Sequence, residues 1–390
     1  MSRPTQLRVG VSLAHVRLPA SSGAGRMWRN VTANLAELMH LGYWGDPHRS
    51  RFRRPPDVWL HDGHVGPLGV PEPVVVHIQE ANWHDESHRP LFEPWFIEKF
   101  AGPSRAAAES ADAVITPSAS SRAQILENYS VDPARVHTVP LGVDLALFRP
   151  ARPGAEALIA QAGGDPSRPY ILFVSTLHPR KNLEALRQAV AGLARRGLPH
   201  SLVIAASPPV DRLHDLQPFR DAAAELPGAP GRVVVLRDLS DVQLAAVMAG
   251  ASVFCLPSLM EGFGLTALEA MACGVPVVVS SCGSLPEVVG DAGVVSDPTA
   301  EALESALHDL LEDSRHMAAL RRAGLERSLG FTWRATAQGW CQVLSTTVPA
   351  APVGRLEQLL PASGPLGHLA RYGPRIPIRR RRWARPLRSG

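Results

Sequence analysis

The chain has 390 residues, of which 45% are hydrophobic and 19% are charged, so it is long enough for two domains and has the composition of a globular enzyme. Its net charge of +4 is unevenly distributed, because residues 346–390 contain nine Arg and one Glu, a net of +8, which leaves −4 for the rest. An acidic body argues against a nucleic-acid partner.

The four cysteines include no Cys-x-x-Cys pair, which favours reduced thiols over disulfides or zinc ligands. The N-terminus leads straight into a strand pattern without a signal-peptide core, and no stretch approaches 18 uninterrupted apolar residues. A cytoplasmic location is therefore expected.

The first half of the chain alternates apolar runs with helical or loop stretches, which is typical of a parallel sheet wrapped by helices. Strands are expected at residues 7–13, 57–60, 73–78, 113–116 and 136–139. A loop containing Gly23, Gly25 and Arg26 is expected after the first strand, followed by a helix over about residues 27–39. This loop resembles half of a glycine-rich phosphate loop, although any tight turn can use glycine.

The second half repeats the alternation after residues 151–168, which are rich in Ala, Gly and Pro and are interpreted as a linker region. Strands are expected at residues 170–174, 201–206, 232–236, 251–256 and 275–279, and helices at 182–196, near 211–225, and at 240–249, 264–273, 300–312 and 332–344. The result is an α/β protein with two doubly wound domains. Domains of this kind that face each other place a cleft at the carboxyl ends of both sheets.

Two carboxylates, Glu261 and Glu269, stand eight residues apart around the start of a predicted helix. The free N–H groups and partial positive charge of a helix N-terminus suit a phosphate, and flanking carboxylates can accept hydrogen bonds from sugar and ribose hydroxyls. Either glutamate can also merely complement the helix dipole or face solvent. Glu269, however, is the only charge in an apolar run, where a carboxylate is costly without a partner. The first hypothesis is therefore a nucleotide-sugar site in which a ligand hydroxyl partners Glu269.

Two adjacent cations, Arg180 and Lys181, follow the first strand of the second half. In a cleft they would neutralise a diphosphate, whereas the alternative is a solvated basic turn. Lys181 is one of only two lysines against 38 arginines, which favours a functional role. His77 ends the strand at 73–78, and a site role and a structural role are equally open for it. No Asp-x-Asp occurs, so neither a metal ion nor another cofactor is expected.

Residues 261–279 resemble the signature of glycosyltransferase family 4, in which two glutamates are separated by seven residues. Residues 179–182 (Pro-Arg-Lys-Asn) and 139–144 (Val-Pro-Leu-Gly-Val-Asp) match two further motifs of that family. The resemblance extends over about residues 7–344. It implies a GT-B fold, with two Rossmann-like domains facing each other across a cleft, and metal-independent transfer of a sugar with retention at the anomeric carbon.

The resemblance also implies a role for each matching residue. Glu261 would contact the donor sugar, Glu269 would hold the ribose hydroxyls, and His77 would lie near the reacting sugar. The remaining matches concern the phosphates: Arg180 and Lys181 through their side chains, Gly262, Phe263, Gly264 and Leu265 through the backbone, and Gly23, Gly25 and Arg26 as a loop on the acceptor side. Glu261, His77 and Lys181 form the candidate catalytic set. The chain departs from the family at Ser175-Thr176, where Gly-Arg is frequent, and at Ile78, where Asp is frequent.

The resemblance implies an acceptor-side domain (1–150) and a donor-nucleotide-binding domain (169–330) on either side of the linker region (151–168), and a helix returning towards the first domain (331–345). The basic tail (346–390) matches nothing in the family. The donor would be GDP-mannose or a UDP-sugar carrying a hexose. The acceptor would be a glycan, a lipid-linked or a small molecule, as in polysaccharide biosynthesis. The alternatives are a GT-B nucleotide-sugar epimerase or hydrolase and a non-catalytic nucleotide-sugar-binding partner protein.

The basic tail carries its own hypothesis. Eight of its arginines fall in the last 20 residues and are interleaved with Trp383 and aliphatic residues. Such a segment is expected either to make peripheral contact with the acidic inner face of a membrane or to be a solvated extension.

Overall fold

The computed structural model describes residues 7–12, 23–44, 55–207 and 221–348. This part of the chain contains two sheets, each with six strands that pair in parallel. The first has the order β2-β1-β3-β4-β5-β6 and the second the order β12-β11-β10-β7-β8-β9. The strand order reverses direction within each sheet, so the predicted doubly wound α/β class is confirmed.

The strands of the first sheet are β1 (Arg8–Ser12), β2 (His40–Trp44), β3 (Val58–Asp62), β4 (Val74–His77), β5 (Ala113–Thr116) and β6 (Val136–Thr138). Those of the second are β7 (Tyr170–Thr176), β8 (Ser201–Ser207), β9 (Val233–Arg237), β10 (Val253–Leu256), β11 (Val277–Ser280) and β12 (Val294–Ser296). Short 3-10 helices occur at η3 (Gly63–Val65), η4 (Asn82–His84), η5 (Arg89–Leu91), η6 (Pro133–Arg135), η7 (Pro179–Lys181) and η8 (Gly290–Ala292).

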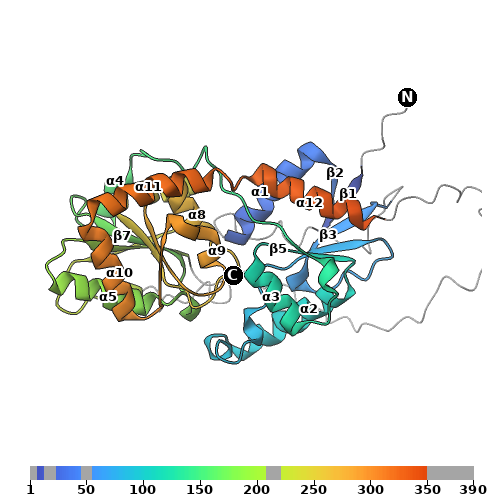
Figure 1. The fold of residues 1–390 in the computed structure, drawn as a ribbon, viewed down its shortest axis with the longest axis horizontal. Helices are drawn as coiled ribbons and strands as arrows, with labels where there is room; N and C mark the ends of the chain where they lie inside the picture. Colours follow the sequence, from blue (N-terminus) through green and yellow to red (C-terminus); the bar gives the residue numbers. More distant parts are fainter. Residues whose placement is uncertain (1–6, 13–22, 45–54, 208–220, 349–390) are drawn as a thin grey trace, which may run out of the picture. The chain divides into compact units, whose positions relative to one another are not determined.

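The first sheet and its helices are called the first lobe here. Its helices are α1 (Gly23–Leu38), α2 (Pro94–Ser110), α3 (Ala119–Asn128) and α12 (Trp333–Thr347). Figure 1 shows α1 and α12 on one side of the strands and α2 and α3 on the other. Trp28, Val31 and Leu35 form a buried stripe on α1 at helical spacing, and the Trp28 ring meets Trp340 of α12 edge-on at 5.4 Å between centroids. The C-terminal helix therefore completes the core of the first lobe.

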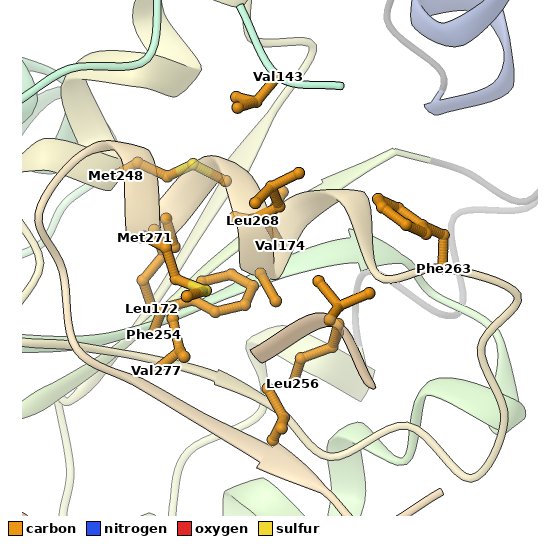
Figure 2. Close-up of a cluster of buried hydrophobic side chains, with 14 of the residues drawn as sticks. Val143, Leu172, Val174, Met248, Phe254, Leu256, Phe263, Leu268, Met271 and Val277 are labelled. Atoms are coloured by element: carbon orange, nitrogen blue, oxygen red, sulfur yellow. The ribbon is translucent and has the colours of Figure 1, made fainter. Parts of the chain in front are cut away.

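The second sheet and its helices form the second lobe. These helices are α4 (Ala155–Gln161), α5 (Leu183–Arg195), α7 (Asp241–Ala249), α8 (Leu265–Ala272), α9 (Leu285–Val289), α10 (Ala300–Glu312) and α11 (Ser314–Ser328). In Figure 1 the strands lie between α5 with α10 and α4 with α8 and α11. Leu268 and Met271 on the inner side of α8 lie over Phe254 and Val277 of the sheet, and all four are fully buried (Figure 2). Each such side chain contributes about 1.5–3 kcal/mol of burial free energy, which fixes α8 firmly against its sheet.

The chain passes between the lobes at two adjacent places. Val143 forms an isolated parallel bridge with Thr332, and Thr336 donates its hydroxyl to the carbonyl of Pro140 at 2.9 Å. A Cβ on Gly142 would lie 2.2 Å from the backbone nitrogen of Trp333, so only glycine allows the two segments to approach this closely.

Several sequence-based expectations differ from the observed elements. The helix expected from about residue 27 begins at Gly23, and the linker region 151–168 contains α4, whose Ala155 and Ile159 are buried. Among the elements that were not predicted, β2 contains glycine and begins two residues after α1 ends, while α11 is strongly charged and buries only Leu320, Gly324 and Ser328. The helix expected near 211–225 falls mostly on residues 208–220, which lie outside the described residues, as does the tail beyond 348. Among the helices that the structure describes, none is long and apolar enough to cross a bilayer.

Candidate functional site

Arg180 and Lys181 lie in a turn whose geometry is set by its neighbours. The turn follows the carboxyl end of β7 and forms η7, with Pro179 at the start, where its fixed φ suits a helical turn. Asn182 adopts a left-handed conformation with φ 56° and donates its side-chain amide to the carbonyls of Pro257 (3.1 Å) and Pro298 (2.7 Å). The bond to Pro298 ties the turn to the segment after β12, and the bond to Pro257 ties it to the loop that follows β10. The two cations consequently face that loop.

The loop between β10 and α8 carries Glu261, which is 7% exposed. The carbonyl of Glu261 accepts hydrogen bonds from the backbone N–H (3.2 Å) and the hydroxyl (3.1 Å) of Ser284. Gly283 has φ 61°, and a Cβ there would lie 2.6 Å from the Glu261 carbonyl oxygen, so the site requires glycine. The backbone that presents Glu261 is therefore held rigidly before any ligand arrives.

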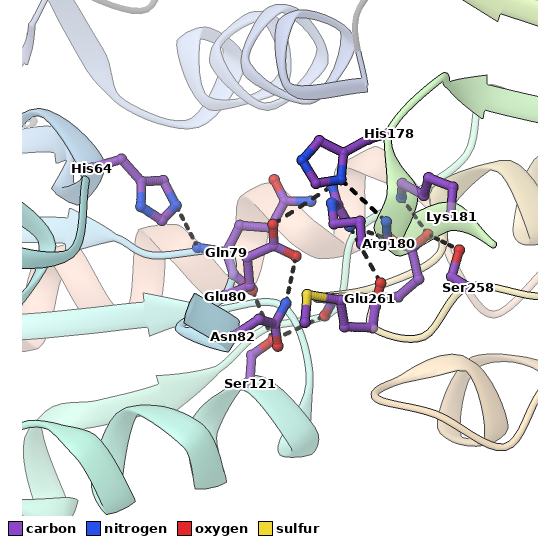
Figure 3. A network of polar contacts seen from close by, with 12 residues as sticks. His64, Gln79, Glu80, Asn82, Ser121, His178, Arg180, Lys181, Ser258 and Glu261 are labelled. Carbon is purple, nitrogen blue, oxygen red and sulfur yellow. Dashed lines mark hydrogen bonds and ion pairs between the residues drawn. The ribbon is translucent and has the colours of Figure 1, made fainter. Parts of the chain in front are cut away.

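The carboxylate of Glu261 is the centre of a polar cluster (Figure 3). Its Oε1 forms an ion pair with Nζ of Lys181 and accepts a hydrogen bond from Ser258 at 2.9 Å, while its Oε2 lies 3.8 Å from the Arg180 guanidinium. Burial lowers the pKa of Lys181, and Arg180 lowers it further, whereas Glu261 opposes both effects. Burial alone would raise the pKa of Glu261, but the charges of Lys181 and Arg180 and its hydrogen bonds hold that pKa below its ordinary value. Glu261 is therefore held in its ionised form.

The first lobe contributes a further carboxylate to this cluster, that of Glu80. Its Oε1 lies 3.7 Å from the Arg180 guanidinium, and its Oε2 accepts a hydrogen bond from Asn82 at 2.9 Å (Figure 3). Glu80 was not predicted from the sequence, although a carboxylate three residues after the end of β4 was an available signal. Arg180 thus stands between two carboxylates, one from each lobe.

The N-terminus of α3 makes polar contacts with the second lobe. The hydroxyl of Ser118 donates to the carbonyl of Gly262 at 2.7 Å, and the Ser121 hydroxyl oxygen lies 3.0 Å from the same carbonyl. The N–H of Ala119 donates to both oxygens of the Glu287 carboxylate at 3.0 Å. The Gly262 carbonyl is thereby turned towards α3.

Glu269 has a protein partner that the sequence did not predict. The residue is 2% exposed on α8, and its carboxylate meets the Arg26 guanidinium of α1, with Nε–Oε1 at 3.3 Å and Nη2–Oε2 at 3.4 Å. Arg26 also pairs with Asp241 at 3.2 Å. Burial raises the pKa of Glu269 to about 7, Arg26 opposes the rise and Asp241 adds to it. These side chains border a cavity of about 320 Å³ that Phe148 and Trp333 also line.

The glycine-rich loop expected at Gly23, Gly25 and Arg26 is part of a helix in the structure. Gly23, Gly25 and Arg26 belong to the first turn of α1 rather than to a phosphate loop before it. Gly25 and Arg26 are buried, and the Arg26 side chain is directed to Glu269 and Asp241. The residues preceding Gly23 back to residue 13 lie outside the described part of the chain.

His77 does end β4 as predicted, but its ring is packed among aromatic side chains. It is 1% exposed, stacks on Trp340 at 5.1 Å between centroids and meets Trp28 edge-on at 5.8 Å. These contacts favour the structural alternative over a place beside a reacting group. Phe263 is likewise a core residue (Figure 2), so only its backbone remains a candidate for ligand contact, together with Gly264 and Leu265 at the start of α8.

No group of three or more potential metal-ligating side chains occurs within the portion of the chain that the structure describes. The contacts described above divide the candidate site into two parts. One is the charged cluster of Glu80, Arg180, Lys181 and Glu261, and the other is the Arg26–Glu269 pair beside the cavity.

Comparison with known proteins adds two family matches. Residues 155–327 match the family described as glycosyl transferases group 1, and residues 49–147 match that described as Glycosyltransferase Family 4. The chain is 35% identical over 268 residues to an MMP alpha-(1->4)-mannosyltransferase of Mycolicibacterium hassiacum, which covers 67% of the chain and 59% of the relative. It is 33% identical over 293 residues to an alpha-maltose-1-phosphate synthase of Mycolicibacterium smegmatis, which covers 70% of the chain and 72% of the relative.

A solved structure of Anabaena HepE in complex with UDP-glucose has the same fold. Its TM-score is 0.66 at 18% identity, with 87% of this chain and 100% of that chain covered. At this identity the likeness establishes the architecture alone, and it agrees with the two-sheet arrangement described above.

Proposed function

This chain belongs to the group 1 glycosyltransferases, and we propose that it transfers a hexose from a nucleoside diphosphate to a hydroxyl group of an acceptor. The observation that carries this proposal is the cluster at the carboxyl end of β7, where Arg180 and Lys181 meet Glu261. Two cations held beside a buried carboxylate suit a ligand that presents phosphates next to a sugar.

We infer that Arg180 binds the diphosphate. Its guanidinium is 3.7 Å from Glu80 and 3.8 Å from Glu261, which are ion-pair distances longer than a hydrogen bond. A guanidinium has five N–H donors, so phosphate oxygens can take up donors that neither carboxylate engages closely. Lys181 adds a point charge that Glu261 holds in place.

The two glutamates of the signature would serve different parts of the donor. Glu261 lies in the charged cluster, next to the proposed diphosphate, and would accept hydrogen bonds from the donor sugar. Glu269 lies beside the cavity and would accept hydrogen bonds from the ribose hydroxyls, which replace part of its contact with Arg26. The backbone from Gly262 to Leu265 would approach the phosphates, because it forms the start of α8.

We propose that transfer proceeds with retention and without a metal ion. The bond from the anomeric carbon to the diphosphate oxygen breaks, the acceptor oxygen bonds to the same face of that carbon, and the hydroxyl proton passes to the leaving diphosphate. Arg180 and Lys181 would stabilise the negative charge that develops on the leaving group, which is where preorganised cations accelerate a reaction most.

Candidate substrates follow from the relatives' names. One is a mannosyltransferase, another forms a maltose phosphate, and the HepE structure contains UDP-glucose. These names support a hexose as the transferred sugar. We propose GDP-mannose or a UDP-sugar as donor and a glycan, lipid-linked or small-molecule acceptor, as in polysaccharide biosynthesis. The cysteine usage and the basic tail support a cytoplasmic enzyme with peripheral contact at the inner face of a membrane.

The test is a thermal-shift screen with UDP and GDP, followed by turnover assays with the matching donor sugars. Anomeric NMR of the product should show retention, and EDTA should leave the rate unchanged. Sugar isomerisation or hydrolysis that is the same with and without acceptors would instead favour an epimerase or hydrolase. Nucleotide binding without turnover on any acceptor would favour a non-catalytic partner protein.

A further inference from the structure

Glu80 faces the charged cluster from the first lobe. It lies in the loop after β4, and its side chain is 15% exposed. Its only close hydrogen bond among the described contacts is that from Asn82 at 2.9 Å to Oε2, and the guanidinium of Arg180 is 3.7 Å from Oε1. A carboxylate accepts about four hydrogen bonds. Glu80 therefore retains capacity for a ligand on the side of Oε1.

The backbone around Glu80 is anchored on both sides. The N–H of Gln79 donates to Nε2 of His64 at 3.3 Å, and the N–H of Ala81 donates to the side-chain oxygen of Gln124 at 3.3 Å. The carbonyl of Gln79 accepts the Ser121 hydroxyl at 2.7 Å. The position of Glu80 is thus built into the first lobe, as Figure 3 shows for the His64–Gln79 contact.

Glu80 is not needed to neutralise the cations of the cluster once a diphosphate is bound. Lys181 has Glu261 as its contacting counter-ion. Glu80 contacts Arg180 and adds only a smaller, longer-range attraction to Lys181. A diphosphate that engages Arg180 would leave Glu80 as an extra negative charge near it, which weakens donor binding. The repulsion is offset if a second ligand donates hydrogen bonds to Glu80 when Arg180 binds the phosphate.

We propose that Glu80 binds a hydroxyl group of the acceptor, which makes the acceptor a polyhydroxylated compound without a negative charge next to its reacting hydroxyl. This inference rests on the proposed function. The acceptor would approach from the first lobe, opposite the Glu261 that is proposed to bind the donor sugar. A phosphate or carboxylate on the acceptor close to its reacting end would be repelled by Glu80.

The experiment compares Glu80→Gln with the wild type and with Glu86→Gln, an exposed carboxylate six residues further along the same segment. UDP and GDP report donor binding by thermal shift. Transfer from UDP-glucose and GDP-mannose is measured with methyl hexosides and myo-inositol as neutral acceptors and with hexose 1-phosphates as anionic ones.

Glu80→Gln should raise the KM for a neutral acceptor by about 10-fold or more, the size expected for one lost charged hydrogen bond. It should also reduce the preference for neutral over phosphorylated acceptors and leave the nucleotide-induced shift equal or larger. Glu86→Gln should match the wild type in every measurement.

An unchanged acceptor KM, with altered nucleotide binding or kcat, would show that Glu80 only holds Arg180 and would overturn the inference while leaving the proposed function intact. Absence of transfer by the wild type from either donor to any acceptor would contradict the proposed function itself, and the inference with it. Glu80→Asp provides a second variant: it keeps the charge but shortens its reach, so the acceptor KM should rise without a change in acceptor-charge preference.

Discussion

Lys181 is buried, and Glu261 is the group that compensates its charge. Breaking a buried ion pair by removing one partner typically costs about 3–5 kcal/mol, because the remaining charge is left without compensation. Around this pair, stability and chemistry therefore depend on the same side chains.

Lys181→Ala should lower kcat/KM by about 10²- to 10³-fold, the effect of losing one preorganised electrostatic contact. It should also lower the free energy of unfolding by about 3–5 kcal/mol. Lys99→Ala is the matched control, since Lys99 is exposed and lies over the rings of Trp95 and Phe100 at 5.8 and 5.3 Å. Steady-state turnover assays measure kcat/KM and urea unfolding measures the free energy of unfolding for both variants. Equal, small effects would show that neither turnover nor stability depends on the Lys181–Glu261 pair.

Glu261→Gln should mainly lower kcat, and Glu269→Gln should mainly raise the donor KM. Glu269 would bind the ribose equally well in the ground state and the transition state, so loss of this contact should raise KM without changing kcat. Charge develops at the sugar that Glu261 faces, so loss of that contact should lower kcat. Steady-state kinetics with varied donor concentration separates the two effects. The reverse pattern would contradict the assigned roles without contradicting the family.

The raised pKa of Glu269 predicts a pH dependence of stability. Its folded-state pKa of about 7 lies above the ordinary value of 4.5, so the folded state binds a proton that the unfolded state lacks between these values. The contribution of Glu269 to stability should be greatest below pH 4.5 and should be lost as pH rises through 7. Glu269→Gln should remove up to about 3 kcal/mol of that decline. Urea unfolding at pH 5, 6.5 and 8 measures it, and parallel profiles for the two proteins would refute the prediction.

Some residues of the site could be predicted from the sequence and others could not. Arg180, Lys181 and Glu261 stand in local motifs next to strand ends, and the structure brings them together. The Arg26–Glu269 pair joins positions 243 apart, so no local pattern reveals it. The sequence correctly indicated that Glu269 needs a partner, but the partner in the structure is an arginine of the other lobe.

At the scale of elements, the strands could be predicted from the sequence because side chains on both of their faces are buried. Apolar runs such as β7 and β10 give a strong signal because both faces are covered by helices. The start of α1 was misjudged because Gly23 and Gly25 are poor helix formers, and tertiary packing of Trp28 and Val31 overrides that preference. Which elements meet across the lobes depends on loop geometry and was not predictable from periodicity.

The loop that carries Glu261 gives a prediction at this scale. Gly283→Ala and Gly197→Ala both place a side chain at positive φ (61° and 90°), which costs about 1–2 kcal/mol. Only at Gly283 would the new Cβ strike the Glu261 backbone, since nothing lies within 4 Å of a Cβ at Gly197. Both variants should therefore lose stability, but only Gly283→Ala should also lose kcat. Equal activity in the two variants would show that the Glu261 loop tolerates displacement.

At the scale of the whole molecule, the basic tail should be separable from donor binding. Because α12 ends at Thr347, a chain truncated after residue 348 keeps the helix that covers the first lobe. It should retain the thermal shift with UDP or GDP and lose sedimentation with anionic liposomes, because basic residues near an anionic surface contribute about 1 kcal/mol each. Unchanged liposome binding would remove the tail from the membrane hypothesis, and lost nucleotide binding would make it part of the fold.

The first lobe is not a continuous stretch of chain, since α12 returns to it after the whole second lobe has been made. Expression of residues 1–150 alone would leave α1 without α12, and Trp28 without the Trp340 ring that meets it edge-on. A chimera that exchanges acceptor specificity with a relative should therefore carry two crossovers, one near residue 150 and one near residue 331. During synthesis on the ribosome, most of the first lobe is translated first but can complete its core only after α12 emerges.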